Sequence, residues 1–226
     1  EDVSFSRPRK DLSWGIPVPD DETQTMYVWV DALVNYISAL GFGSRAEGLF
    51  RKYWPADVQI IGKDNLRFHA AIWPGMLLSS GIPLPKNIFV HGFITVDGQK
   101  ISKTVGNIID PYELVKKYGT DPLRYYLLRE IPPFEDGDFS YRKFEERYNG
   151  DLADGLGNFL SRVLALGEKE HDIVSLGADA LILKKIEEVR VLSRANLEKF
   201  KFHEALSAIW DLISFGDEYI SLKEPW

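Results

Sequence analysis

Two lysines stand three residues apart in the segment Lys100-Ile101-Ser102-Lys103-Thr104, which directly follows Asp97-Gly98. Ammonium groups on a loop can neutralise the charge that develops on a phosphoryl group and on a departing pyrophosphate. A solvated surface loop has the same composition, because charged runs usually face water. The segment by itself therefore leaves a phosphate site and a plain surface loop both open.

Gly62-Lys63-Asp64 follows the apolar run Val58–Ile61, where the carboxyl end of a strand is expected. Ligands bind at that position in open α/β sheets. Glycine lets a ligand approach the backbone, and the Asp64 carboxylate could accept hydrogen bonds from a ribose. A plain strand-to-helix turn, with Asp64 or Asn65 as the helix N-cap, explains the same residues without a ligand.

Aromatic residues gather near another expected strand-to-helix junction, at Trp29 and Tyr36, with Ala32 between them. His69 and Trp73 are four residues apart and share one face of a later predicted helix. Together these side chains could line an apolar pocket with a few polar groups. Aromatic residues at this spacing are also typical of a hydrophobic core.

In the C-terminal part, Asn158 and Arg162 lie four residues apart and are predicted to face solvent or a partner. Asparagine and arginine are donors suited to base edges and phosphates, and Trp226 could stack on an unpaired base. An ordinary exposed helix face with a C-terminal core tryptophan is the alternative.

Two kinds of element must position these residues. Strand-like and helix-like runs alternate in the first part, which predicts an α/β fold with a parallel sheet; the expected strands are Met26–Val30, Val58–Ile61 and Ile88–Val96, and the expected helices are Ala32–Leu40, Leu66–Leu78 and Pro111–Tyr118. The Asp97-Gly98 pair predicts a tight turn. From about Tyr148 onward, apolar residues recur at helical spacing, with breaks expected at Gly167 and Gly177, which predicts a helical bundle.

The composition excludes several classes of protein. Of the 226 residues, 45% are hydrophobic and 27% charged, which is typical of a globular protein. Cysteine is absent, so disulfides, thiol catalysis and Cys-ligated zinc are excluded within this chain, and a metal would bind through oxygen or imidazole. The net charge of −7 argues against general electrostatic binding of nucleic acid. We find no apolar run long enough to span a membrane and no secretory signal, so a cytoplasmic location is expected.

Taken in order, these segments resemble the methionyl-tRNA synthetases, a family of class I aminoacyl-tRNA synthetases. The resemblance covers nearly the whole chain and rests on Trp14–Pro19, Trp29–Tyr36, Gly62–Asp64, Phe68–His69, Trp73–Pro74, Lys100–Thr104, Gly119–Tyr126, Glu135–Ser140, Asn158–Arg162 and Pro225–Trp226. Many class I synthetases share the lysine loop. The aromatic segment and the set Asn158, Arg162 and Trp226 make the resemblance methionyl, and argue against a leucyl or cysteinyl enzyme.

The resemblance implies ATP-dependent activation of L-methionine to methionyl-adenylate, with Mg²⁺ accompanying ATP, and transfer of the methionyl group to tRNA(Met). It implies that Lys100, Ser102 and Lys103 are catalytic and that Gly62, Asp64, Ile94 and Lys103 bind ATP. The implied methionine-binding residues are Trp29, Ala32, Tyr36, Asn65 and His69. Asn158, Arg162 and Trp226 match the positions that read the anticodon CAU.

The implied fold is the second half of a Rossmann-like catalytic domain followed by an all-α anticodon-binding bundle. Residues 1–104 would be catalytic, 105–147 would contact the tRNA stem, and 148–226 would form part of the bundle.

The chain departs from the family pattern at three positions. Ile101 and Thr104 replace the usual Met and Ser of the lysine loop, and Asn65 stands where many relatives carry an apolar residue. The upstream His-Ile-Gly-His motif is missing, and any zinc site would lie outside this chain. We therefore expect a fragment that is inactive alone and needs the missing N-terminal half, in cis or as a partner chain. The alternative is a non-catalytic tRNA-binding fragment or split subunit.

Overall fold

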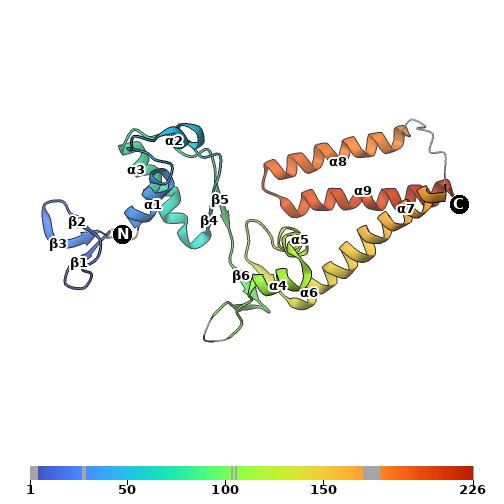
Figure 1. The fold of residues 1–226 in the computed structure, drawn as a ribbon, viewed down its shortest axis with the longest axis horizontal. Coiled ribbons are helices and arrows are strands. Elements are labelled where there is room, and N and C mark those ends of the chain that lie inside the picture. The colour runs from blue at the N-terminus through green and yellow to red at the C-terminus, as the bar shows by residue number, and fades with distance from the viewer. Residues whose placement is uncertain (1–4, 27–28, 103, 105, 170–178, 226) are drawn as a thin grey trace. The chain divides into compact units, whose positions relative to one another are not determined.

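The computed structural model describes residues 5–26, 29–102, 104, 106–169 and 179–225. Lys103, Trp226 and the helix break expected at Gly177 lie outside these residues. The chain divides into two compact units, Glu1–Val90 (unit 1) and His91–Trp226 (unit 2). Figure 1 gives the order of the elements along the chain.

Unit 1 begins with a three-stranded antiparallel sheet in the order β1-β3-β2. Its strands are β1 (Ser6–Pro8), β2 (Ile16–Val18) and β3 (Asp21–Met26). The strand expected at Met26–Val30 is wrong, because β3 ends at Met26 and helix α1 (Trp29–Ser38) begins at Trp29. Leu33 and Ile37 repeat at helical spacing and are buried, and Asp31 lies in the first helical turn, where a negative charge is favourable.

The rest of unit 1 mixes short helices with a strand pair, β4 (Gln59–Gly62) and β5 (Ile88–His91). The helices are α2 (Gly48–Tyr53), the 3-10 turn η1 (Lys63–Asn65), the π-helical η2 (Phe68–Ile72) and α3 (Trp73–Ser79). The predicted helix over Leu66–Leu78 is thus helical throughout, with a π segment inside it. The core of unit 1 consists of Leu33, Ile37, Trp54, Trp73, Leu77 and Ile82.

The strand expected over Ile88–Val96 is instead two strands in different sheets, β5 and β6 (Ile94–Val96). The extended run is interrupted near Gly92, where an added Cβ would lie 2.1 Å from the Glu135 carbonyl oxygen. In unit 2, β6 pairs antiparallel with β7 (Gln99–Lys100) and parallel with β8 (Gly137–Phe139). The tight turn between β6 and β7 is confirmed, since Asp97 and Gly98 have φ of 48° and 74°.

The first helices of unit 2 enclose a core of Val96, Leu114, Leu123, Tyr126, Phe139 and Phe144. They are α4 (Pro111–Tyr118), α5 (Thr120–Glu130), α6 (Tyr141–Glu146) and the π-helical η3 (Arg147–Gly157). The predicted helix at Pro111–Tyr118 is confirmed. Asp110 caps it by accepting from the Tyr112 N–H at 2.8 Å, and Pro111 occupies the first position.

Long helices follow: α7 (Asn158–Lys169), α8 (Ala180–Glu198) and α9 (Phe202–Lys223). The break expected at Gly167 is wrong, since α7 continues to Lys169. A glycine costs a helix only about 1 kcal/mol, and Val163 and Leu166 of α7 face the apolar side chains of α9. Helices α8 and α9 run antiparallel side by side (Figure 1), joined where the Ser193 hydroxyl donates to the Ala205 carbonyl. No helix in the described part of the chain is long and apolar enough to cross a membrane.

Candidate functional site

One face of α1 carries the predicted pocket residues of unit 1. Trp29, Ala32 and Tyr36 recur at spacings of three and four residues and share that face. Leu33 and Ile37 lie on the adjacent face of the same helix, where they are 1% and 4% exposed. Burial of Leu33 and Ile37 anchors the helix on the core that also contains Trp73.

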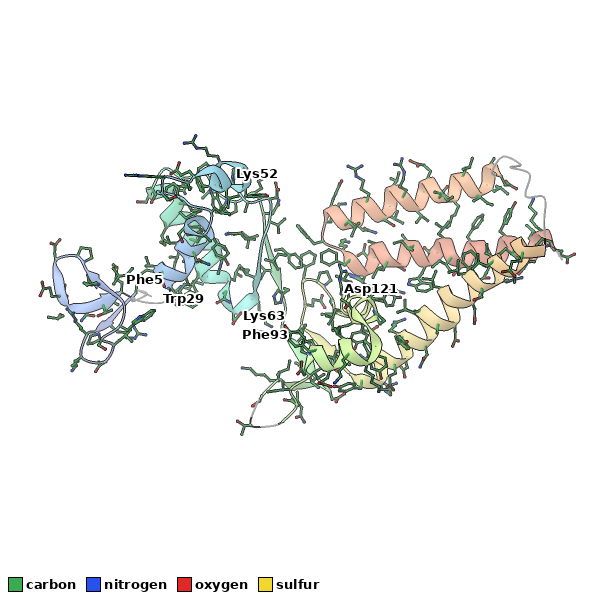
Figure 2. The ribbon with its side chains drawn as sticks, in the orientation of Figure 1. Phe5, Trp29, Lys52, Lys63, Phe93 and Asp121 are labelled. Atoms are coloured by element: carbon green, nitrogen blue, oxygen red, sulfur yellow. The ribbon has the colours of Figure 1, made fainter. Side chains whose placement is uncertain are left out.

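Aromatic contacts join this face to η2 and α3. The Trp29 ring, labelled in Figure 2, stacks on Phe68 with 3.6 Å between ring centroids and 12° between planes. Tyr36 lies 6.1 Å from Trp73, which is 1% exposed. Phe68 is one of the residues on which the family resemblance rests, but the sequence alone did not indicate a binding role for it. We call the set Trp29, Tyr36, Phe68, His69 and Trp73 the aromatic pocket, after the pocket that the sequence predicts there.

His69 is the buried polar member of the aromatic pocket. Its Nδ1 lies 3.1 Å from the Asn65 carbonyl oxygen, and its Nε2 lies 3.0 Å from the Tyr36 hydroxyl. A carbonyl only accepts, so Nδ1 carries the proton, and in the neutral ring Nε2 accepts from Tyr36. His69 lies within the π-helical segment, a distortion that often occurs at functional sites. The structure therefore brings Tyr36, His69 and the backbone of Asn65 together in one chain of hydrogen bonds.

Gly62 and Asp64 lie where the sequence predicts them, at the carboxyl end of β4. Gly62 is the N-cap of η1 and no side chain caps that turn, so Asp64 and Asn65 lie inside η1 and neither is its N-cap. A plain strand-to-helix turn without a ligand is not contradicted by this geometry. Asp64 is exposed. This arrangement leaves its carboxylate available to an external hydrogen-bond donor.

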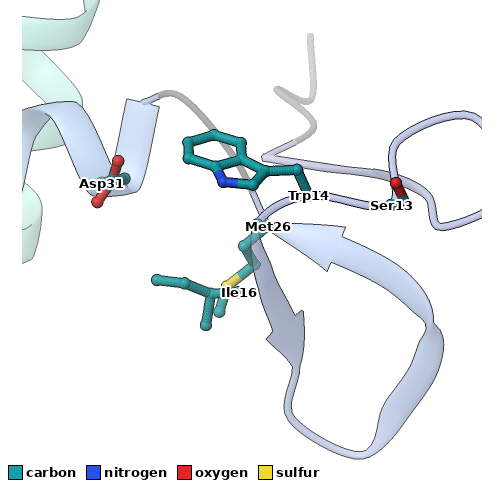
Figure 3. A pocket seen from close by; sticks show the side chains of 6 residues that line it. Ser13, Trp14, Ile16, Met26 and Asp31 are labelled. Atoms are coloured by element: carbon teal, nitrogen blue, oxygen red, sulfur yellow. The ribbon is translucent and has the colours of Figure 1, made fainter.

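A hollow of unit 1 has a volume of about 400 Å³ and lies between the first sheet and the start of α1 (Figure 3). The Trp14, Ile16 and Met26 side chains border it from the sheet, and Asp31 borders it from α1. Trp14 is 73% exposed, so this tryptophan is not part of the core.

The lysine-loop residues belong to unit 2. Lys100 ends β7 and pairs with Thr95 of β6, one residue after Ile94. Lys100 is exposed, Ile94 is 38% exposed and Ser102 is half-buried. Pairing of β6 with β7 therefore brings the backbones of Ile94 and Lys100 close together.

Asp138 of β8 supports the turn that leads into this loop. Its Oδ1 accepts from the Thr95 hydroxyl at 2.6 Å and from the Gly98 N–H at 2.7 Å. These two bonds, the Thr95 bond first, hold the pKa of the Asp138 carboxyl below its ordinary value. Sequence analysis gave Asp138 no role, because its partners stand about forty residues away.

The predicted anticodon residues differ from one another in their surroundings. Asn158 is exposed at the first position of α7, whereas Arg162 is half-buried against α9. The Arg162 Nη1 lies 3.3 Å from Asp217 Oδ1, and its Nη2 donates to the Ser221 hydroxyl at 3.2 Å. The guanidinium is therefore held by α9, whereas the sequence predicts only that Arg162 faces solvent or a partner.

Sequence analysis missed a polar junction in unit 2 that joins α5, η3 and α9. The Tyr125 hydroxyl donates to Asp151 Oδ2 and accepts from Trp210 Nε1 at 2.6 Å. Burial, followed by the bond to Asp151, raises the pKa of Tyr125 above its ordinary value. Tyr125 and Trp210 stand 85 residues apart, so only the folded chain reveals the contact.

Among the described residues, no group of three or more His, Asp or Glu side chains could hold a metal ion. The structure therefore assigns no residue of the described chain to Mg²⁺ or zinc. Both remain predictions from the resemblance.

Comparisons with known proteins agree with one another. A family model described as tRNA synthetases class I (M) matches residues 1–164. The chain is 44% identical over its whole length to a methionine–tRNA ligase of Thermotoga maritima, and 45% identical to one of Brucella suis. A structure of Mycobacterium tuberculosis methionyl-tRNA synthetase in complex with methionyl-adenylate superposes with a TM-score of 0.89 at 42% identity, over 100% of this chain. Its apo form gives 0.84 at 39% identity over 98% of this chain.

The chain is shorter than these relatives. It spans 36% of the Thermotoga protein, 44% of the Brucella protein and 45% of the Mycobacterium chain bound to methionyl-adenylate.

Proposed function

The chain belongs to the class I (M) family of tRNA synthetases, and on that premise we propose that it is part of an enzyme that joins methionine to tRNA(Met) using ATP. The observation that carries the proposal is its likeness, over 100% of its length, to a synthetase in complex with methionyl-adenylate. Because the chain spans less than half of that relative, the activity is proposed for the complete protein. The same proposal assigns a Rossmann-like fold to residues 1–104, tRNA-stem contacts to 105–147 and an anticodon-binding bundle to 148–226. It also includes a cytoplasmic location.

In the proposed first step, an oxygen of the methionine carboxylate bonds to the α-phosphorus of ATP. The bond from that phosphorus to the bridging oxygen breaks, and pyrophosphate leaves. Lys100 and Lys103 stabilise the charge on the departing pyrophosphate, and Ser102 lies between them. Gly62, Asp64 and Ile94 bind the nucleoside, with the Asp64 carboxylate accepting from the ribose. Magnesium is brought by ATP, whose phosphate oxygens suit it.

The aromatic pocket selects methionine in this proposal. Trp29, Ala32 and Tyr36 form one wall, and the hydrogen-bonded set of Tyr36, His69 and Asn65 supports another. Rings fixed by stacking favour an unbranched thioether over smaller or branched side chains, at about 1–3 kcal/mol per methylene. A polarisable sulfur also makes favourable contacts with aromatic rings.

In the proposed second step, a hydroxyl of the terminal adenosine of tRNA attacks the acyl carbon of methionyl-adenylate, and AMP leaves. Asn158, Arg162 and Trp226 read the CAU anticodon. The Arg162 guanidinium is already oriented by Asp217 and Ser221, which reduces the entropy lost when a base binds.

The test is ATP–pyrophosphate exchange by the complete protein carrying Lys100→Ala. Exchange should fall by about 100- to 1000-fold, because a donor to the developing charge is lost. The matched control is Lys184→Ala, which removes an exposed lysine of α8 that pairs with Glu188 and should leave exchange unchanged. Unchanged exchange with Lys100→Ala would refute the role of the loop.

Binding of an anticodon stem-loop separates the proposal from its alternative. The complete protein should prefer CAU over a loop with one base changed, at fixed salt, and Arg162→Ala should weaken that preference. A protein that shows the preference but no exchange until a second chain is added would be the split subunit. Equal binding of every anticodon would contradict the methionyl assignment.

A further inference from the structure

Asn107 contacts the backbone of the lysine loop twice through its side-chain amide. Its Oδ1 accepts from the Ser102 N–H at 2.8 Å, and its Nδ2 donates to the Lys100 carbonyl at 3.1 Å. Asn107 is half-buried and follows Gly106, whose φ is +74°. The side chain therefore lies across the base of the segment that carries the proposed catalytic residues.

A primary amide offers one donor and one acceptor side, as a peptide unit does. Strand β7 ends at Lys100, so pairing with β6 supports the backbone only up to that residue. Asn107 supplies a comparable pair of bonds just beyond this point, to the Lys100 carbonyl and to the Ser102 N–H. The Gly106 N–H adds a third bond, to the Ser102 carbonyl at 3.1 Å.

Fixing this backbone determines where the Lys100 ammonium can reach. Lys100 is exposed, and a lysine side chain is a long, flexible stem. The direction in which that stem leaves the chain is set by the backbone at Lys100, which Asn107 holds at its carbonyl. A displacement of about 1 Å at a reacting group can cost about 100-fold in rate.

We propose that Asn107 is a positioning residue for the phosphate chemistry, acting through the backbone of Lys100 and Ser102 rather than by touching ATP. The inference rests on the proposed function and adds a residue to the machinery of the same site. The Asp138 carboxylate holds the turn before β7, and Asn107 holds the segment after it. The loop is thus supported from both sides by side chains that lie outside the lysine segment.

The experiment measures ATP–pyrophosphate exchange by the complete protein with Asn107→Ala. We expect kcat to fall by about 10- to 100-fold, while KM for methionine changes less than about twofold, because the pocket residues belong to the other unit. Asn107→Asp is isosteric and keeps the acceptor for Ser102, but it places an acceptor against the Lys100 carbonyl, so it should lose as much activity. Asn87→Ala is the matched control, since its Nδ2 donates to the Asp57 carbonyl at 3.1 Å in unit 1.

A double-mutant cycle with Lys100→Ala tests how Asn107 acts. If Asn107 works through Lys100, substituting it in the Lys100→Ala background costs less than about twofold further. A purely structural role gives the same loss in both backgrounds and overturns the inference, as does exchange by Asn107→Ala within about twofold of the parent. If Asn107→Ala fails to fold, Asn107→Asp takes its place in the cycle.

The outcome also separates this inference from the proposed function. Unchanged exchange with Lys100→Ala refutes the proposed role of the loop. Loss of exchange with Lys100→Ala, together with normal exchange by both Asn107 variants, refutes the positioning role alone.

Discussion

The aromatic pocket of unit 1 and the lysine loop of unit 2 are held in place by different forces. Rings and a buried core fix the pocket, where Trp73 and His69 are 1% and 6% exposed. Polar side chains fix the loop, where Asp138 and Asn107 bind backbone atoms while Lys100 stays exposed.

The difference matches what each region is proposed to do. A pocket that measures the shape of an apolar side chain needs walls that do not move, and close packing supplies them. A loop that meets developing charge needs a defined backbone, whereas its ammonium groups must remain able to reach the phosphates. Substitutions in the aromatic pocket and around the lysine loop test this difference.

The largest effect is expected from Trp73→Ala, which removes a core member of the aromatic pocket and leaves a cavity in its place. Because Trp73 is 1% exposed, the free energy of unfolding should fall by about 3–5 kcal/mol, as measured by denaturant titration. Trp14→Ala is the control, since Trp14 is 73% exposed and its loss should cost less than about 0.5 kcal/mol. Equal losses would show that the core does not hold the pocket.

Gly92→Ala should disturb the base of the sheet that carries the loop. The new Cβ would lie 2.1 Å from the Glu135 carbonyl oxygen, so the backbone must shift, at a cost of about 1–3 kcal/mol. Gly48→Ala, with no atom within 4 Å of its added Cβ, is the matched control in denaturant titration. If the Gly92→Ala protein were as stable as the parent, the close approach of Gly92 to the Glu135 carbonyl would not constrain unit 2.

Tyr36→Phe removes one hydrogen bond from the aromatic pocket and keeps the ring. His69 Nε2 then loses its partner, so kcat/KM for methionine in pyrophosphate exchange should fall by about 5- to 10-fold, or about 1 kcal/mol. Tyr53→Phe, at a residue 53% exposed, should have no effect. An unchanged kcat/KM would show that ring packing alone positions His69.

The smallest effect is expected from the titration of Asp138. Its folded-state pKa is below the ordinary 3.8, so its ionised form stabilises the fold above that pH, and this contribution is lost as pH falls through the lowered pKa. Asp138→Asn lacks the contribution, so the difference in unfolding free energy between parent and variant should shrink below about pH 3.8. We expect less than about 1 kcal/mol, because water reaches this half-exposed carboxylate. A difference that stays constant down to pH 2 would remove Asp138 from the support of the loop.

Local patterns sufficed to predict several elements. Pro111 marks the start of α4, and Asp97-Gly98 marks the turn before the lysine segment, because each acts through its own backbone conformation. The same reasoning failed at Gly167, which lies inside α7, because a single glycine costs a helix only about 1 kcal/mol. It also failed at Gly92, where close approach of Glu135 divides an apolar run that reads as one strand.

Residue types and their spacing are enough to identify the groups that could take part in chemistry and their order along the chain. Which of these groups come into contact depends on the fold. Arg162 bonds to Asp217, 55 residues away, and Tyr125 bonds to Trp210, 85 residues away. Sequence periodicity does not predict such distant partners. Even the contact of Asn107 with Lys100 depends on a turn at Gly106 that returns the chain to the end of β7. Contacts between distant residues arise from packing of the whole unit, because burial is decided by all of its elements together.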